Sequence, residues 1–174
     1  MHAPPDSFGA RIGHGWDRHR LAAVAPAGPG RPLVLGGVVL ASAVGPVAHS
    51  DGDALAHAVT DAVLGAAGLG DIGQLFPDSD PALEGADSLG LLSAAMGRVR
   101  GAGWVVGNLD ATVLLEAPKL GVAREKIRDN LARALGVAAG AVNIKAKTGE
   151  GVGVVGSGQA VEAHAVVLLV GGET

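Results

Sequence analysis

The sequence predicts an α/β protein of the α+β sandwich type, in which about three helices cover a mixed sheet of four or slightly more strands. Segments with apolar residues at helical spacing are interspersed with segments in which apolar and polar residues alternate. No fixed-period repeat and no charged linker divides the 174 residues, a length that suits one domain. We therefore expect a flexible leader over residues 1–10 and a single domain over residues 11–174.

Three segments have the apolar spacing of a helix packed against a core. The clearest begins at Asp53, a natural N-cap, and ends before Gly68. Its apolar positions, such as Leu55 and Val59, fall on one helical face. The predicted helices cover residues 53–67, 87–100 and 122–135.

Strands are predicted where apolar residues alternate with polar ones or form short runs between glycines. The alternation is clearest at Leu109, Ala111, Val113 and Leu115. Around Gly36-Gly37 we expect two short strands or a tight bend. The predicted extended segments are residues 32–40, 104–115, 141–146 and 159–170, with a further strand ending near residue 19.

Composition excludes several classes of function. The formal charge of -4 and the two Trp, two Phe and no Tyr argue against a nucleic-acid surface. With no Cys, metal chemistry can rest only on His, Asp and Glu. No secretory signal and no apolar stretch long enough to span a membrane occurs, so we expect a cytoplasmic protein without a membrane partner.

Histidines beside acidic residues in the first third of the chain indicate a metal site. Asp17 and His19 are two residues apart on an expected strand and therefore point to the same side. His57 and Asp61 are four residues apart on an expected helix, so that His57 can bind a metal while Asp61 orients it. The histidines of this cluster are His14, His19, His49 and His57, whereas His2 and His164 have no acidic neighbours.

One carboxylate and two imidazoles, from Asp17, His19 and His57, form a three-ligand set for zinc. Such a set leaves a fourth position open, and its net positive charge favours a phosphate oxygen. Each pair alone could be an ordinary surface pair, but their joint occurrence favours a catalytic metal site.

Near the C-terminus, Gly151, Gly153 and Gly156 match the glycine spacing of a dinucleotide-binding fingerprint. That motif must open a helix with an acidic residue about 20 positions later, whereas strand-like sequence follows here. We therefore expect a flexible or phosphate-facing loop over residues 149–158.

Three strings resemble the 2-C-methyl-D-erythritol 2,4-cyclodiphosphate synthase family in order and spacing. They are Arg11-Ile-Gly-His-Gly-Trp-Asp-Arg-His19, Ala48-His-Ser-Asp-Gly-Asp53 and Gly70-Asp-Ile-Gly-Gln-Leu-Phe-Pro-Asp-Ser-Asp-Pro81. The resemblance continues through residues 85–88, 107–110, 117–119 and 142–146, and so covers nearly everything after residue 10.

The resemblance implies a cyclising, CMP-releasing phosphorus–oxygen lyase of the non-mevalonate isoprenoid pathway. Its substrate would be 4-diphosphocytidyl-2-C-methyl-D-erythritol 2-phosphate, whose 2-phosphate attacks the β-phosphorus and expels CMP. The family works as a homotrimer with active sites shared between subunits. Catalysis would then rest on positioning and charge neutralisation, without a protein nucleophile.

The resemblance also assigns site residues. Zinc ligands fall on Asp17, His19 and His57, and Glu150 matches the ligand of a second metal, Mg²⁺ or Mn²⁺. His49 and Thr148 match the residues assigned to catalysis. The substrate-binding positions are Asp17, His19, His49, Ser50, Asp71, Ile72, Gly73, Phe76, Asp78, Asp80, Leu115, Ala117, Pro118, Lys119, Lys147, Thr148 and Glu150.

The chain departs from the family pattern after residue 146. Lys147 and Gly149 interrupt a run that is commonly Thr-Thr-Thr-Glu, and Val154 and Ser157 replace the usual Phe and Arg. Without that arginine, we expect the central trimer cavity to lack the site at which the family binds isoprenoid diphosphates.

Two other functions remain open from the sequence. The changes in residues 147–157 would suit a catalytically impaired homologue that binds cytidine nucleotides or metal. A three-ligand zinc site could also serve a hydrolase of another phosphate ester. The segment Ala117-Pro118-Lys119 favours the synthase, since a general hydrolase has no reason to carry a nucleotide-binding segment.

Overall fold

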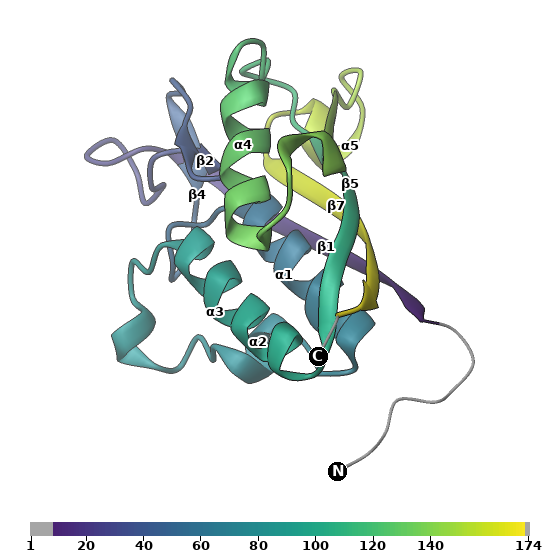
Figure 1. Cartoon of the computed structure of the whole chain (residues 1–174). Helices are drawn as coiled ribbons and strands as arrows, with labels where there is room; N and C mark the ends of the chain where they lie inside the picture. Colours follow the sequence, from purple (N-terminus) through teal and green to yellow (C-terminus); the bar gives the residue numbers. More distant parts are fainter. Residues whose placement is uncertain (1–8, 173–174) are drawn as a thin grey trace.

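The structure of the chain, a computed structural model, describes residues 9–172. A five-stranded sheet forms one layer and the helices form the other (Figure 1). Most of the expected leader lies outside the described residues. Its last residue, Ala10, is the first residue of strand β1.

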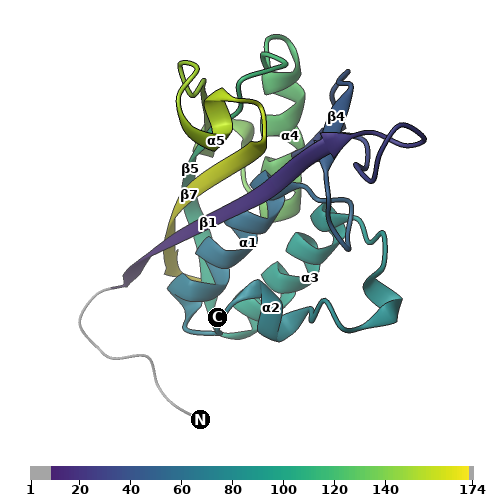
Figure 2. The ribbon, with the colours of Figure 1, turned by 180° about the vertical axis from the view of Figure 1, so that it is seen from behind.

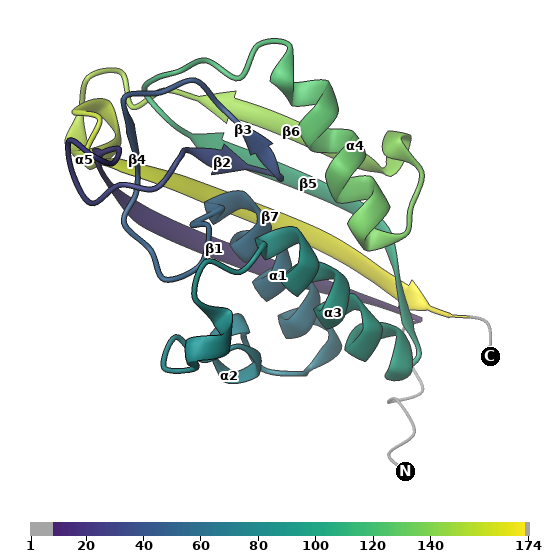
Figure 3. The same ribbon diagram turned by 90° about the vertical axis from the view of Figure 1, so that its left-hand side faces the viewer.

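The sheet has the strand order β4-β1-β7-β5-β6. Neighbouring strands are antiparallel except for β5 and β6, which run parallel and are joined through α4. Figure 3 shows β1, β7, β5 and β6 side by side. Their bounds are β1 Ala10–Ala23, β4 Val44–Pro46, β5 Trp104–Leu114, β6 Val142–Lys147 and β7 Ala160–Gly171.

Three long helices cover one face of this sheet, as expected, and within residues 9–172 none of these three lies on the opposite face of β1 and β7 (Figure 2). The covering helices are α1 Ala54–Ala67, α3 Ser88–Gly101 and α4 Ala123–Leu135. Shorter elements are α2 Ile72–Leu75, α5 Gly153–Gly156, the 3-10 turns at Pro81–Leu83 and Ala139–Ala141, and a hairpin of β2 Val34–Leu35 with β3 Val38–Val39.

Helix α1 begins and ends beside the capping residues that the sequence predicted. Asp53 caps α1 by accepting a hydrogen bond from the Ala56 backbone N–H, and Gly68 ends that helix in the left-handed conformation. The predicted loop over residues 149–158 differs, because it contains the single turn of α5. Strand β7 follows that turn, in agreement with the rejection of the dinucleotide fingerprint.

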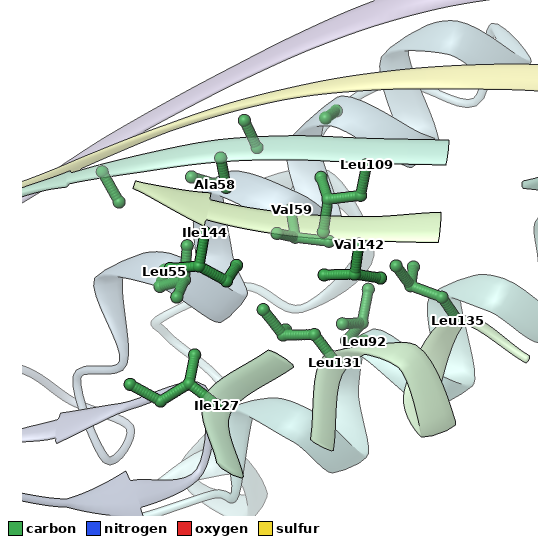
Figure 4. Packing of buried hydrophobic residues seen from close by; sticks show 14 of the residues in the cluster. Leu55, Ala58, Val59, Leu92, Leu109, Ile127, Leu131, Leu135, Val142 and Ile144 are labelled. Carbon is green, nitrogen blue, oxygen red and sulfur yellow. The ribbon is translucent and has the colours of Figure 1, made fainter. Parts of the chain in front are cut away.

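The core fills the space between the sheet and the helices. Figure 4 shows Leu131 and Leu135 of α4 facing Val142 of β6, with Leu55 and Val59 of α1 nearby. The alternating residues Leu109, Ala111, Val113 and Leu115 are buried, as their spacing predicted. Small and branched side chains therefore supply most of the buried apolar surface.

Strand β1 and helix α1 approach each other more closely than side chains would allow. Gly13 and Gly15 are buried on the helix-facing side of β1. A Cβ atom at Gly15 would overlap the carbonyl oxygen of Ala58, and one at Gly13 would overlap that of Ala62. Glycine is required at both positions because the helix backbone occupies the space of a side chain.

In the described part of the chain, no helix combines the length and apolar character needed to cross a membrane.

We expect Gly15→Ala to lower the free energy of unfolding by about 3 kcal/mol, because the methyl group must push α1 away from β1. Gly65→Ala is the matched control, since Gly65 is exposed on α1 with no atom near an added Cβ. The control should stabilise the protein by about 0.5–1 kcal/mol through helix propensity. Urea denaturation of both variants tests the constraint, and equal effects would refute it.

Candidate metal centre and substrate cavities

Three predicted metal ligands come together where β1 packs on α1. Asp17 and His19 follow Gly15 on the helix-facing side of β1, and His57 lies on the first turn of α1. Within residues 9–172 they form the one group of three or more His, Asp or Glu side chains placed to hold a metal. The close β1–α1 contact therefore sets the separation of the ligands.

The geometry suits a small divalent cation. The Oδ2 atom of Asp17 lies 2.8 Å from Nδ1 of His19 and 3.2 Å from Nδ1 of His57, and the three candidate ligand atoms fall within 4.8 Å of one another. Ligand atoms around a tetrahedral zinc ion are about 3.3 Å apart. The three groups can thus reach one ion with small adjustments.

An unsatisfied buried atom provides an independent test of fit. Nδ1 of His19 is buried and has no hydrogen-bond partner among residues 9–172, because its short contact with Asp17 lacks hydrogen-bond geometry. Leaving such an atom unpaired costs free energy, which a bound cation would recover. The donor set therefore fits a divalent metal.

The electrostatics of the group agree with this. Burial alone would raise the pKa of the Asp17 carboxyl group, but the adjacent rings of His19 and His57 hold that pKa below its usual range. Burial would lower the pKa of His57, yet the carboxylate of Asp17 raises it overall. A carboxylate with this environment remains ionised and available as a ligand.

Asp61 does not orient His57 as predicted. Its Oδ1 accepts a hydrogen bond of 2.8 Å from the backbone N–H of Ile72 and so fixes the start of α2. The second ring nitrogen of His57, Nε2, lies 2.8 Å from Oγ of Ser88 and 3.3 Å from Oγ of Ser50. Helical spacing brings Asp61 to the cavity wall, whereas a residue of α3 contacts the imidazole.

His14 does not belong to the metal group. Residues alternate between the two faces of β1, so His14 lies on the uncovered face, opposite Asp17 and His19. There its Nε2 is 3.5 Å from Nδ1 of His164 on β7. The four-histidine cluster inferred from sequence was wrong at this position, and His2 lies outside the described residues.

The three candidate metal ligands line a cavity of about 460 Å³. Arg31 holds one wall, since its side chain donates to the carbonyl oxygens of Ala48 and His49 at 2.9 and 3.1 Å. The predicted site residues lining this cavity are Asp17, His19, His49, Ser50, His57, Ile72, Gly73, Phe76 and Asp78. Asp71 and Asp80 instead cap the adjacent turns, Asp71 at α2 and Asp80 at the 3-10 turn.

A second cavity of about 480 Å³ contains the predicted nucleotide-side residues. Oγ1 of Thr148 donates to Oε1 of Glu150 at 2.7 Å, and the backbone N–H of Gly149 donates to Glu116. The predicted residues lining it are Leu115, Pro118, Lys119, Lys147, Thr148 and Glu150. Ala117 is not part of the lining and forms a cis peptide bond with Pro118.

Several residues around these cavities were missed by sequence reasoning. Arg18 and Arg20 line the first cavity, and Arg124, on the first turn of α4, lines the second. Asp53 was predicted as an N-cap, but its contact with Gly37 was not. The residue is buried, and burial raises its pKa to about 6 although backbone N–H groups of Ala56 and Gly37 donate to it. The basic residues could have been suspected from their spacing beside Asp17 and Lys119, whereas the contact with Gly37 has no local signal.

The sequence matches known proteins over almost its whole length. The model of the YgbB family matches residues 10–170. A relative from Bordetella pertussis named 2-C-methyl-D-erythritol 2,4-cyclodiphosphate synthase is 53% identical over 159 residues, which cover 91% of this chain and 94% of that protein. The chloroplastic synthase of Arabidopsis thaliana is 48% identical over 166 residues, covering 95% of this chain and 69% of that protein.

Solved structures agree in fold. A CDP complex of IspF from Plasmodium falciparum superposes with a TM-score of 0.81 at 33% identity, covering 96% of this chain and 100% of that one. The bifunctional IspDF of Campylobacter jejuni gives a TM-score of 0.87 at 39% identity, covering 95% of this chain and 43% of that one.

We expect a divalent cation such as Zn²⁺ to stabilise the folded chain by about 2.7 kcal/mol at a hundredfold excess over its dissociation constant. The gain should disappear in Asp17→Asn and persist in Asp78→Asn, whose carboxyl group lines the same cavity without belonging to the ligand group. It should also decrease as the pH falls through the raised pKa of His57, because protons then compete for the imidazole.

Thermal unfolding with and without metal measures these differences. Equal stabilisation of both variants would show that the cation binds elsewhere.

Proposed function

The chain belongs to the YgbB family. From this premise we propose that it acts as a cyclodiphosphate synthase of isoprenoid biosynthesis. The reaction converts 4-diphosphocytidyl-2-C-methyl-D-erythritol 2-phosphate into 2-C-methyl-D-erythritol 2,4-cyclodiphosphate and CMP. One observation carries the assignment to this chain's own residues: Asp17, His19 and His57 converge on one cavity in a chain about half identical to synthases.

In the proposed reaction, an oxygen of the 2-phosphate forms a bond to the β-phosphorus. The bond from the β-phosphorus to the oxygen shared with the α-phosphate breaks, and CMP leaves with that oxygen. No water is consumed and no protein atom forms a covalent bond. The protein therefore contributes by folding the substrate back on itself and by neutralising its phosphates.

We assign the zinc side of the substrate to the first cavity. A zinc ion on Asp17, His19 and His57 would polarise a phosphate oxygen. His49 and Ser50 would hold the phosphate from the wall that Arg31 anchors. The erythritol would contact Ile72, Gly73, Phe76 and Asp78, with Asp71 and Asp80 supporting those turns.

We assign the cytidine and the α-phosphate to the second cavity. Lys119 and Lys147 supply positive charge there. Thr148 would stabilise the transferring phosphates, and Glu150 would bind Mg²⁺ or Mn²⁺. A single carboxylate suffices for such an ion when phosphates and water complete its coordination.

The nucleotide and zinc residues line different cavities of one chain, which supports an active site completed by a second copy. The uncovered face of β1 and β7 offers the contact surface. Ile12, Trp16 and Val166 expose 74%, 45% and 44% of their surface there. We propose a homotrimer assembled through this face, working in the cytoplasm without nucleic-acid or membrane partners.

The changes after residue 146 favour one alternative, a homologue that binds its ligands but turns over slowly. Lys147 adds a cation beside Thr148 and Gly149 removes a hydroxyl. The Ser157 hydroxyl group donates to the carbonyl oxygen of Val154 at 3.3 Å and supplies no charge. The expected loss of an anion site in the trimer cavity stays a prediction.

We expect the purified protein to convert the diphosphocytidyl substrate into cyclic diphosphate and CMP in the presence of Zn²⁺ and Mg²⁺. Asp17→Ala should abolish the reaction, since it removes the carboxylate ligand, while retaining the fold. Phosphorus-31 NMR distinguishes the products. Cyclic product from the wild-type chain supports the synthase, release of inorganic phosphate supports a hydrolase, and CMP binding without turnover supports the impaired homologue.

Mixed oligomers test the shared site. Asp17→Ala and Lys119→Ala should each be inactive alone, because each damages one half. After unfolding and refolding together, about a quarter of the interfacial sites should combine two intact halves, by random assortment of subunits into trimers. Return of that fraction of activity supports a site between subunits, whereas a mixture as inactive as its parents supports a site within one chain.

A further inference from the structure

The segment Gly85-Ala86-Asp87-Ser88 matched the family pattern without receiving a role in the site. Ser88 is the first residue of α3 and is completely buried. Its hydroxyl group lies between two charged or ionisable groups, with Oγ 2.5 Å from Oδ1 of Asp51 and 2.8 Å from Nε2 of His57. A buried serine in this position calls for an explanation beyond packing.

The direction of these hydrogen bonds follows from the number of protons available. A carboxylate only accepts, so in the contact with Asp51 the Ser88 hydroxyl is the donor. The same hydroxyl has no second proton to give. Its oxygen must therefore accept from His57, which places a hydrogen on Nε2 of the imidazole.

Asp51 is held in place to accept this proton. Its Oδ1 also accepts the backbone N–H of Asp53 at 3.1 Å, and its Oδ2 accepts the backbone N–H of Ser88 at 3.1 Å. The carboxylate thus ties the start of α1 to the start of α3. These two bonds fix the orientation of the carboxylate. The Ser88 hydroxyl group can then donate its hydrogen in one direction only, toward Oδ1 of Asp51.

We propose that Ser88, oriented by Asp51, is a positioning residue that holds His57 in the Nε2–H form, with the lone pair of Nδ1 directed at the metal position beside Asp17. This rests on the metal site of the proposed function and assigns what orients one of its ligands. Nδ1 of His57 lies 3.2 Å from Oδ2 of Asp17, on the side of the ring opposite Ser88. Because a carboxylate only accepts, the metal-free ring donates a hydrogen from Nδ1 to Asp17, and a bound cation takes the place of that hydrogen. Partners of this kind on the distal nitrogen typically change metal affinity 10–100-fold.

Ser50 is the competing partner for Nε2, at the longer distance of 3.3 Å. Its Oγ accepts the backbone N–H of Gly52 at 3.2 Å. Ser50 also lines the substrate cavity, whereas Ser88 is not part of that lining. Removing Ser88 should therefore affect the ligand His57 without removing a group that contacts substrate.

The test compares Ser88→Ala with Ser88→Thr, which keeps the hydroxyl group, and with Ser93→Ala. Ser93 lies on the same helix, and its exposed hydroxyl donates to the carbonyl oxygen of Leu89. Competition with a chromophoric chelator measures zinc affinity. We expect a 10–100-fold loss in Ser88→Ala, recovery in Ser88→Thr, and no change in Ser93→Ala.

Nitrogen-15 NMR of the histidine rings gives a readout that needs no metal. In the metal-free wild-type chain we expect His57 to carry a hydrogen on Nε2 that Ser88 accepts, beside the Nδ1 hydrogen that Asp17 accepts, and in Ser88→Ala we expect the Nε2 hydrogen to be lost from part of the population. A folded Ser88→Ala with wild-type zinc affinity and an unchanged ring would overturn the proposal. So would an Nε2 without hydrogen in the wild-type protein, a result that holds even where the variants fail to fold.

The same experiments distinguish failure of the proposed metal site from failure of the role of Ser88. The wild-type chain could bind no zinc and still carry a hydrogen on Nε2 of His57 that Ser88→Ala loses. This result would refute the metal site but leave the effect of Ser88 on the His57 ring intact.

Discussion

The contact between strand β1 and helix α1 is the constraint on which the rest of the molecule depends. Gly13 and Gly15 let the helix backbone lie directly on the strand. The same strand then carries Asp17 and His19 while the helix carries His57. Because protein interiors are close-packed and resist deformation, this contact sets ligand distances that no single flexible side chain could maintain.

Two carboxylates, from the buried Asp53 and the partly buried Asp51, hold loops and helix ends around the metal ligands. Asp53 caps α1 and reaches Gly37 of the β2–β3 hairpin, and Asp51 joins the starts of α1 and α3. Three of these bonds satisfy backbone N–H groups at helix starts, those of Asp53, Ala56 and Ser88, and the fourth satisfies the N–H of Gly37 in the hairpin turn. The metal centre therefore rests on elements that are tied together behind it.

The sequence predicted the elements well because their signals are local. The caps Asp53 and Gly68 and the alternation around Leu109 concern residues a few positions apart. Asp17 and His19 could be paired for the same reason, through the period of a strand. His14 was misplaced because only the end of this strand was predicted, near residue 19. The strand in fact begins at Ala10, so the alternation of side chains places His14 on the face opposite Asp17 and His19.

The errors share a physical origin, which is separation along the chain. His57 meets Ser88 across 31 residues, and helical spacing offered Asp61 instead. The division of the predicted substrate residues between two cavities likewise depends on where β5, β6 and their connecting loops lie in space. Local periodicity carries no information about such contacts. The family resemblance identified site residues but not the side chains that lie next to them in space.

Strand β1 also serves two surfaces at once, with the ligands on one side and Ile12, His14 and Trp16 on the other. Because successive side chains alternate, the insertion or deletion of one residue before Asp17 would exchange the two surfaces. The ligands would turn outward and bulky side chains would meet α1 where glycine is needed. Length variation within this strand is thus far more harmful than most substitutions, and insertions during evolution are tolerable only in the loops that flank it.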